Sequence, residues 1–267
     1  MAHSAKLPKV HALWIGDRLG PLAAACLQSF SKNGHEVILH CYQNLADLPK
    51  GIQVQDANKI IPKEEIISHR DSGSFAVFAD IFRYELLQQG ADLYVDCDVY
   101  CLQPIEKADY YFGKETGHNV NSAVLAIPPN SLLLNSLCNL RLTGHERWPW
   151  EPKTKFKLKH LTRMLKPNAG KRTLASKRWG DVGPTALTYL AKSFGVFEKA
   201  TPIDVLYPLH YDSVELLFDS NLQLVDLVTH RTKCIHLYNA IIRYNGFNPM
   251  EAPRSSPIGR MLSGEAK

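Results

Sequence analysis

The sequence lacks the long apolar segments and phosphate-binding motifs that would assign it to several common classes. No stretch of about 20 apolar residues occurs in the 267-residue chain, which excludes a transmembrane helix. The N-terminal residues do not follow the charged, apolar and small-residue order of a signal peptide, so we expect a cytoplasmic protein. Neither GxGxxG nor GxxxxGK(S/T) is present, which argues against dinucleotide-binding and P-loop proteins. The six cysteines include no CxxC pair, and such usage is typical of reduced, buried thiols.

Acidic residues are scarce between residues 151 and 180. This segment has ten lysines and arginines against one acid, Glu151, giving +9, so the rest of the chain carries −4 of the net +5. Aromatic and apolar residues flank or interrupt the basic ones: Trp148, Trp150, Phe156, Leu158 and Trp179. Residues 148–179 are therefore either a solvated surface loop or a segment that docks on an anionic membrane. Nucleic acid is not expected as a partner, because no recognition motif accompanies the charge.

Strand-sized and helix-sized segments alternate along the chain, which predicts an α/β fold. Residues 9–16 indicate a buried strand, residues 21–34 a helix with Pro21 in its first turn, and residues 35–42 a second strand. This opening is typical of an open, nucleotide-binding sheet flanked by helices. Further elements are expected as strands at 121–128 and 233–240 and as helices at 131–142 and 183–195. We expect a single domain over residues 1–248 and a flexible tail over 249–267.

The stretch LYVDCDVY, residues 93–100, places two carboxylates inside an otherwise apolar segment. If it forms one continuous strand, Tyr94, Asp96, Asp98 and Tyr100 point to the same face. Two acids on one face are costly to desolvate unless a cation or a donor-rich ligand compensates them. An Asp-x-Asp also occurs often by chance, so its meaning depends on the segments around it.

The preceding segment, residues 75–89, predicts a helix that is apolar on nearly every side and is therefore buried. Asp80 and Arg83 lie three residues apart on this helix and share one side of it. Two interpretations stay open. The two charges form an ion pair that only stabilises the helix, or they contribute to a cleft shared with Asp96 and Asp98.

Residues 78–100, FADIFRYELLQQGADLYVDCDVY, resemble the sugar-binding region of glycosyltransferases of the family 32 type. Three further matches follow the order found in that family. VHALWIG at 10–16 resembles the HxxWxG strand that also begins the large glucosylating toxins, and the Gly-Pro at 183–184 and HLYN at 236–239 fall in the expected places. The sequence departs from the family pattern before Tyr94, where Gly90 is followed by Ala91 rather than by a second glycine.

The resemblance implies a GT-A type fold and roles for individual residues. Asp80, Arg83, Asp96 and Asp98 would form the catalytic set. The nucleotide-sugar donor would contact Trp14, Asp80, Arg83, Tyr94, Asp96 and Asn121. The metal ligands would be Asp98, Asp96 and His236, and Asp181 would face the acceptor.

The function implied by the resemblance is transfer of a hexosyl unit, with retention of configuration, in cell-surface polysaccharide assembly. The donor would be a UDP- or GDP-hexose, the acceptor a glycan or a lipid-linked sugar, and the cofactor Mn²⁺ or Mg²⁺. Such an enzyme would work in the cytoplasm, with contact to the inner face of the membrane. Two alternatives use the same residues: a nucleotidyl or phosphoryl transferase, and a non-catalytic module that binds sugar nucleotides or glycans. A toxin-like transferase that modifies a protein is disfavoured, because no delivery segment is recognisable.

Overall fold

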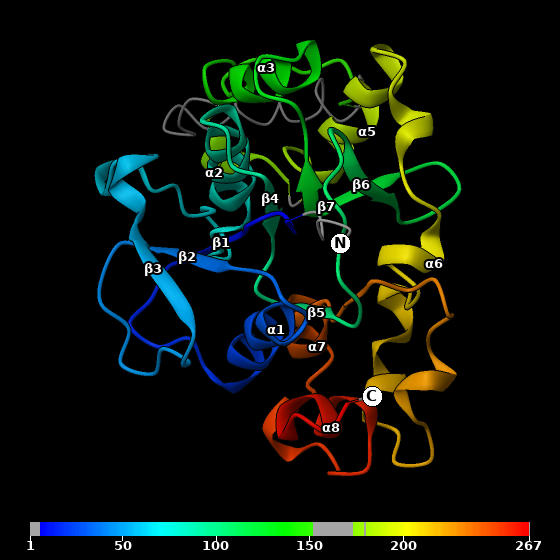
Figure 1. Ribbon diagram of the computed structural model, residues 1–267. Coiled ribbons are helices and arrows are strands. Elements are labelled where there is room, and N and C mark those ends of the chain that lie inside the picture. The colour runs from blue at the N-terminus through cyan, green and yellow to red at the C-terminus, as the bar shows by residue number, and fades with distance from the viewer. Residues whose placement is uncertain (1–5, 152–172, 179, 267) are drawn as a thin grey trace.

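The computed structural model describes residues 6–151, 173–178 and 180–266. In this part of the chain, a six-stranded sheet has the strand order β3-β2-β1-β4-β7-β6, as Figure 1 shows. Strands β1 to β4 run parallel, whereas β7 pairs antiparallel with both β4 and β6. The strands are β1 (Val10–Trp14), β2 (Val37–Cys41), β3 (Ile52–Asp56), β4 (Leu93–Val95), β6 (Tyr111–Lys114) and β7 (Val120–Ala126).

The opening strand–helix–strand unit forms as the sequence predicts. Helix α1 (Pro21–Lys32) begins at Pro21, directly after Gly20, whose φ of 78° favours glycine. Strands β1 and β2 pair in register from Val10 opposite Val37, and all five residues of β2 are buried. The carboxyl ends of β1 and β4 therefore meet at one edge of the sheet.

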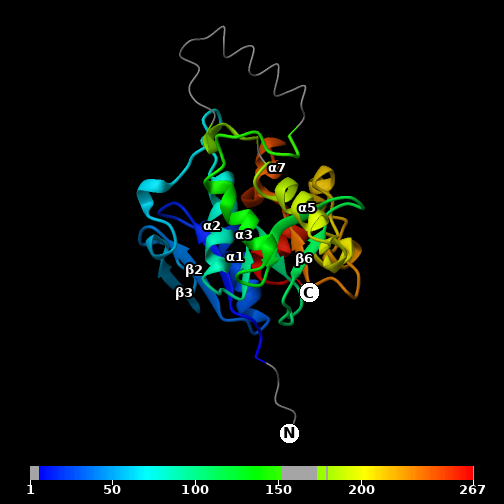
Figure 2. The same ribbon diagram turned by 90° about the horizontal axis from the view of Figure 1, so that it is seen from above.

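Helices cover both faces of the sheet. Helices α2 (Ala76–Gln88), α3 (Leu132–Cys138) and α5 (Pro184–Ser193) lie on one face, where α2 packs beside α3 (Figures 1 and 2). Helix α1 covers the opposite face. Successive side chains of β1 point to opposite faces of the sheet and so contribute to both hydrophobic layers. Leu13 packs in the layer under α2, and Ala12 packs in the layer under α1. The predicted α/β fold, an open sheet flanked by helices, is confirmed.

The expectation of one strand over residues 93–100 is wrong. Strand β4 ends at Val95, and β5 (Val99–Cys101) belongs to a separate two-stranded sheet with β8 (Cys234–His236). A turn separates the two strands and is closed by the hydrogen bond from the Val99 amide to the Asp96 carbonyl oxygen, 3.1 Å. The two carboxylates therefore leave a turn rather than one face of a pleated strand.

Several other elements are shorter than predicted. The strand expected at 233–240 ends at His236, because the chain turns at Tyr238 in the left-handed conformation (φ 51°) and begins helix α7 (Asn239–Tyr244). The helix expected at 131–142 becomes a 3₁₀ turn after Cys138. Helix α6 (Ile203–Leu206), a single short turn, has no counterpart among the expected elements.

The C-terminal segment is ordered against the body, which differs from the flexible tail expected for residues 249–267. Helix α8 (Pro257–Ser263) is capped by Ser256, whose Oγ accepts from the Gly259 amide at 3.2 Å. Ile258 and Met261 are almost fully buried and pack against helices α1 and α7 (Figure 1). These buried apolar side chains hold against the body a segment whose proline and serine content is typical of a loop.

Trp148, in the aromatic flank of the basic segment, is buried. Trp148 is 3% exposed, stacks on Trp150 at 5.3 Å between ring centroids, and lies under the ammonium group of Lys177. Residues 152–172 and Trp179 lie outside the described residues. No helix among the described residues combines the length and apolar character needed to cross a bilayer.

Candidate active site

A cavity of about 280 Å³ opens at the carboxyl edge of the sheet, where β1 and β4 end. Ligands bind at this edge in open α/β sheets. Helix α2 and the start of β7 contribute further wall residues. The lining includes all eight residues proposed from the sequence for donor and metal binding: Trp14, Asp80, Arg83, Tyr94, Asp96, Asp98, Asn121 and His236.

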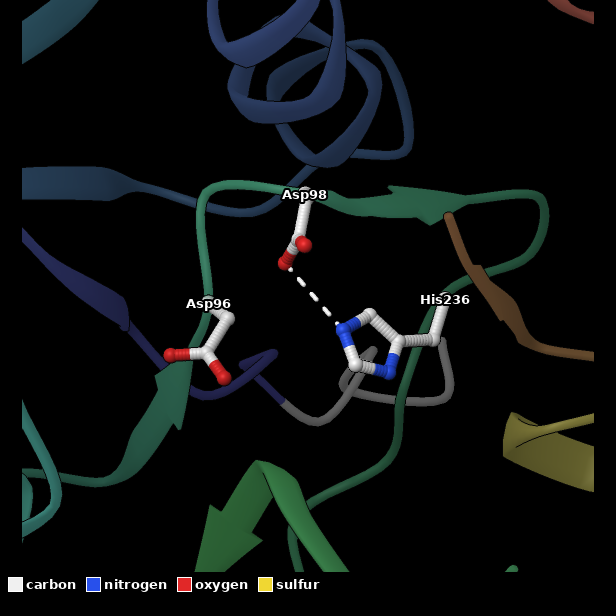
Figure 3. Close-up of side chains that lie close together, drawn as sticks. All are labelled: Asp96, Asp98 and His236. Atoms are coloured by element: carbon white, nitrogen blue, oxygen red, sulfur yellow. Dashed lines mark ion pairs between the residues drawn. The ribbon is translucent and has the colours of Figure 1, made fainter. Parts of the chain in front are cut away.

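Asp96, Asp98 and His236 converge in this cavity, each offering one ligand atom within 4.8 Å of the others. Figure 3 shows the two carboxylates leaving the turn between β4 and β5, with the imidazole facing them from β8. Nε2 of His236 lies 3.2 Å from Oδ1 of Asp98, and Nδ1 of His236 is buried without a hydrogen-bond partner among the described residues. Two carboxylates and one imidazole are a donor set that suits Mn²⁺ and similar divalent ions, so the residues fit a metal site.

Backbone groups hold Asp98 in position. Its Oδ2 accepts from the Asn239 amide at 2.9 Å, and its carbonyl oxygen accepts from the Leu237 amide at 2.9 Å. Burial alone would raise the pKa of Asp98. The neighbouring His236 and the hydrogen bond from the Asn239 amide instead hold this pKa below its ordinary value. For His236, burial opposes the charge, yet Asp98 and Asp96 raise the pKa of the imidazole. Each partner thus favours the charged form of the other, and a divalent cation would compete with a proton for this pair.

Arg83 joins the metal-ligand group to helix α2. Its guanidinium is 3% exposed and lies 2.9 Å from Oδ1 of Asp96 and 3.3 Å from Oδ1 of Asp80. Burial, partly offset by Arg83, raises the pKa of Asp80 to about 6, while burial also raises the pKa of Asp96. The arrangement combines the two interpretations of the sequence. Asp80 and Arg83 form an ion pair, Arg83 also pairs with Asp96, and Asp80 and Arg83 both line the cavity.

Neighbouring groups fix the guanidinium further. The ring of Tyr94 lies under it at 4.7 Å, and the carbonyl oxygens of Ala79 and Ser122 accept its hydrogen bonds. The guanidinium thus donates four hydrogen bonds, to Ala79, Ser122 and both carboxylate oxygens of Asp96, from the planar fork that distinguishes arginine.

Trp14 and Asn121 both line the cavity. Trp14 is half-buried, and its indole Nε1 donates to the Arg18 carbonyl oxygen at 2.8 Å, which orients the ring. Asn121 is 5% exposed, and its Nδ2 donates to Oε1 of Glu115 at 2.6 Å. Their expected contacts with the donor stay predictions.

Asp181 does not line the cavity. Its carboxylate accepts from the guanidinium of Arg178 at 3.0 Å and from the Arg178 amide, and it is 4% exposed. These bonds tie the carboxylate to the turn before α5, and its expected contact with an acceptor stays a prediction.

Sequence reasoning missed four residues at or beside the site. The sequence indicates Gly183 only as part of a Gly-Pro pair. In the structure, a side chain at this position would overlap both carboxylate oxygens of Asp80, so the site needs a glycine there. Tyr238 and Asn239 were quoted within HLYN without a role, although Tyr238 donates to Glu115 at 3.1 Å. Glu115 itself lies after β6 in a segment that carries no recognisable signal.

Comparisons with known proteins give weak similarities. No family model and no curated protein sequence matches the chain. The ligand-free glycosyltransferase domain of the YGT toxin is similar at 11% identity and a TM-score of 0.47, over 74% of this chain and 79% of that one. The UDP-bound domain of the same toxin is similar at 10% identity and a TM-score of 0.48, over the same shares. The bifunctional glycosyltransferase WbbM is similar at 11% identity and a TM-score of 0.35, over 99% of this chain and 52% of that one. Because these TM-scores are below 0.5, the function of this chain has to be argued from its own side chains.

Proposed function

We propose that the protein is a metal-dependent glycosyltransferase that moves a hexosyl unit from a UDP- or GDP-hexose to a glycan or lipid-linked acceptor. One observation carries the proposal. Asp96, Asp98 and His236 lie within 4.8 Å of one another in the same cavity as the buried Asp80–Arg83 pair. A metal-ligand group beside a fixed carboxylate and guanidinium suits a ligand with a diphosphate and a ring of hydroxyls.

Asp96, Asp98 and His236 would hold Mn²⁺ or Mg²⁺, which supplies charge neutralisation and Lewis-acid assistance to a departing diphosphate. The hydrogen bond from Asn239 and the ion pair with Arg83 keep the two carboxylates in place before any ligand arrives. Preorganised groups of this kind stabilise developing charge without having to reorient.

Asp80 and Arg83 would orient the donor sugar and its phosphate. Asp80 lines the cavity, is 5% exposed, and accepts a hydrogen bond from Oγ of Ser122 at 3.4 Å. Trp14 would stack on the base, Asn121 would contact the sugar, and Tyr94 would form the floor below Arg83. Transfer with retention and a place in cell-surface polysaccharide assembly are the proposals that the family 32 resemblance adds.

A screen of nucleotide sugars tests this function against its alternatives. The proposal expects one UDP- or GDP-hexose to release free hexose with Mn²⁺ and none after chelation. Turnover of nucleoside triphosphates without release of sugar would instead support a nucleotidyl or phosphoryl transferase. Tight binding of a nucleotide sugar with no turnover, even with added glycans, would support a non-catalytic module.

The glycine at position 183 gives a prediction about the donor site. Gly183→Ala is expected to lower donor turnover at least about tenfold, because the new Cβ displaces the Asp80 carboxylate. Steady-state hydrolysis with Mn²⁺ measures this. Gly117→Ala is the matched control, since a Cβ there meets no atom within 4 Å. Equal turnover in the two variants would mean that the position of Asp80 does not matter.

The basic segment between residues 151 and 180 leads to a prediction about membranes. We propose that its charge draws the protein to anionic bilayers, since each lysine or arginine near such a surface contributes about 1 kcal/mol. Vesicle sedimentation should increase with anionic lipid and decrease with salt. It should disappear when Lys153, Lys155, Lys157 and Lys159 become glutamine. The control removes four exposed lysines elsewhere, Lys6, Lys50, Lys59 and Lys63. Equal loss in both variants, or equal recovery on neutral vesicles, would contradict a specific role for the segment.

A further inference from the structure

A second cavity, of about 590 Å³, lies beside the first. The two share four wall residues: Asn121, Gly180, Pro184 and Ile241. A molecule bound in the second cavity therefore lies next to whatever occupies the metal-ligand cavity. None of the roles assigned above uses this second space.

Aromatic side chains form one wall of the second cavity. Tyr189 on α5 and Tyr211 are 39% and 37% exposed, which is high for such large rings. Trp150 packs against Tyr189 at 5.3 Å between centroids, and its Nε1 donates to the Asp181 carbonyl oxygen at 3.0 Å. Trp150 therefore supports the ring of Tyr189, and Tyr189 and Tyr211 line the cavity with part of their surface exposed. Exposed rings of this kind suit the apolar C–H face of a pyranose.

Polar groups also line the second cavity. Glu115 accepts from both Asn121 (2.6 Å) and Tyr238 (3.1 Å) through Oε1, and Oε2 accepts no hydrogen bond from the described residues. Lys192 also lines the cavity, and its Nζ donates to the His118 carbonyl oxygen at 2.6 Å. The carboxylate of Glu115 and the ammonium group of Lys192 leave the cavity wall with no excess of positive or negative charge. The cavity therefore does not favour a strongly charged ligand. Few fixed polar groups opposite aromatic rings are typical of sites that bind small polar ligands in one orientation.

We propose that this second cavity is the acceptor subsite and takes the terminal pyranoside of a glycan. The ring of that sugar stacks on Tyr189, and one of its hydroxyls donates to Glu115. The inference rests on the proposed glycosyltransferase function, and it chooses a carbohydrate over a protein side chain as acceptor. In the transfer, the acceptor oxygen bonds to the anomeric carbon of the donor. The bond from that carbon to the diphosphate oxygen breaks with its electron pair, and the hydroxyl proton passes to the leaving diphosphate.

Saturation-transfer NMR on the full chain tests the acceptor subsite. The probes are the methyl α- and β-pyranosides of glucose, galactose and mannose, with methyl β-lactoside as a disaccharide. We expect at least one probe to receive saturation from the native protein. Tyr189→Ala should weaken its binding about tenfold, the loss of one stacked ring. Tyr211→Ala provides a second variant in case the first does not fold. Phe194→Ala is the matched control, because Phe194 is 38% exposed at the end of α5 and lines neither cavity.

Titration of UDP and GDP with Mn²⁺ into the native protein distinguishes a failure of the acceptor subsite from a failure of the proposed glycosyltransferase function. Nucleotide binding with no saturation of any glycoside would overturn the acceptor subsite and leave the donor site intact. Glycoside binding that is unchanged in both tyrosine variants would likewise overturn it. Glycoside binding without nucleotide binding would contradict the proposed function, and the acceptor role with it.

Discussion

Replacement of Asp98 by asparagine is expected to reduce metal-dependent nucleotide binding about 100-fold or more while the fold persists. Asp98 supplies one of three ligand atoms in the group and has 22% of its side chain exposed toward the cavity. An amide oxygen still accepts from the Asn239 amide, but it provides no negative charge for a divalent ion. Calorimetric titration of UDP or GDP, with and without Mn²⁺, measures the change.

Asp109→Asn provides the control for Asp98→Asn, because it removes one exposed carboxylate outside the site. We expect it to bind nucleotide and Mn²⁺ like the native protein. If Asp98→Asn retains native affinity in the presence of Mn²⁺, the metal-ligand group is assigned to the wrong residues.

Replacement of Asp80 by asparagine is expected to lower donor turnover about 100- to 1,000-fold with a small loss of stability. The turnover effect has the size seen when one fixed polar group is removed from a reacting centre. The stability effect is small because Arg83 keeps its ion pair with Asp96 at 2.9 Å and its hydrogen bond to Ser122. A buried charge left with no partner would cost about 3–5 kcal/mol instead.

Thermal unfolding and steady-state hydrolysis of the same preparation distinguish these cases. A melting temperature close to native with turnover lost indicates that Asp80 serves the donor. Full turnover per folded molecule, together with a marked loss of stability, would show that the Asp80–Arg83 pair only holds α2 against the sheet.

The elements that depend on local pattern could be predicted from the sequence. Helix α2 is apolar on nearly every side, and β2 is apolar apart from His40, so both are expected to be buried. The polar residues of 78–100 also pointed to one site. The structure brings Asp80, Arg83, Asp96 and Asp98 into one cavity, together with His236 from the last strand.

Features that depend on tertiary contacts could not be predicted in this way. Asp96 and Asp98 converge because a turn reverses the chain between two sheets, and the hydrogen bonds that fix it come from β7 and from residues 237–239. The same limit applies to Arg83, whose second partner depends on how α2 packs on β4. Glu115 and Tyr189 meet at one cavity from segments 74 residues apart, and neither carries a local signal.

Anomalous diffraction from crystals of the native protein grown with Mn²⁺ and UDP or GDP tests the metal-ligand group most directly. We expect one strong manganese peak between Asp96, Asp98 and His236, within bonding distance of about 2.0–2.3 Å of their oxygen and nitrogen atoms and in contact with the nucleotide phosphates. A nucleotide bound in the cavity with no peak there, or a manganese ion bound at other residues, would contradict the assignment.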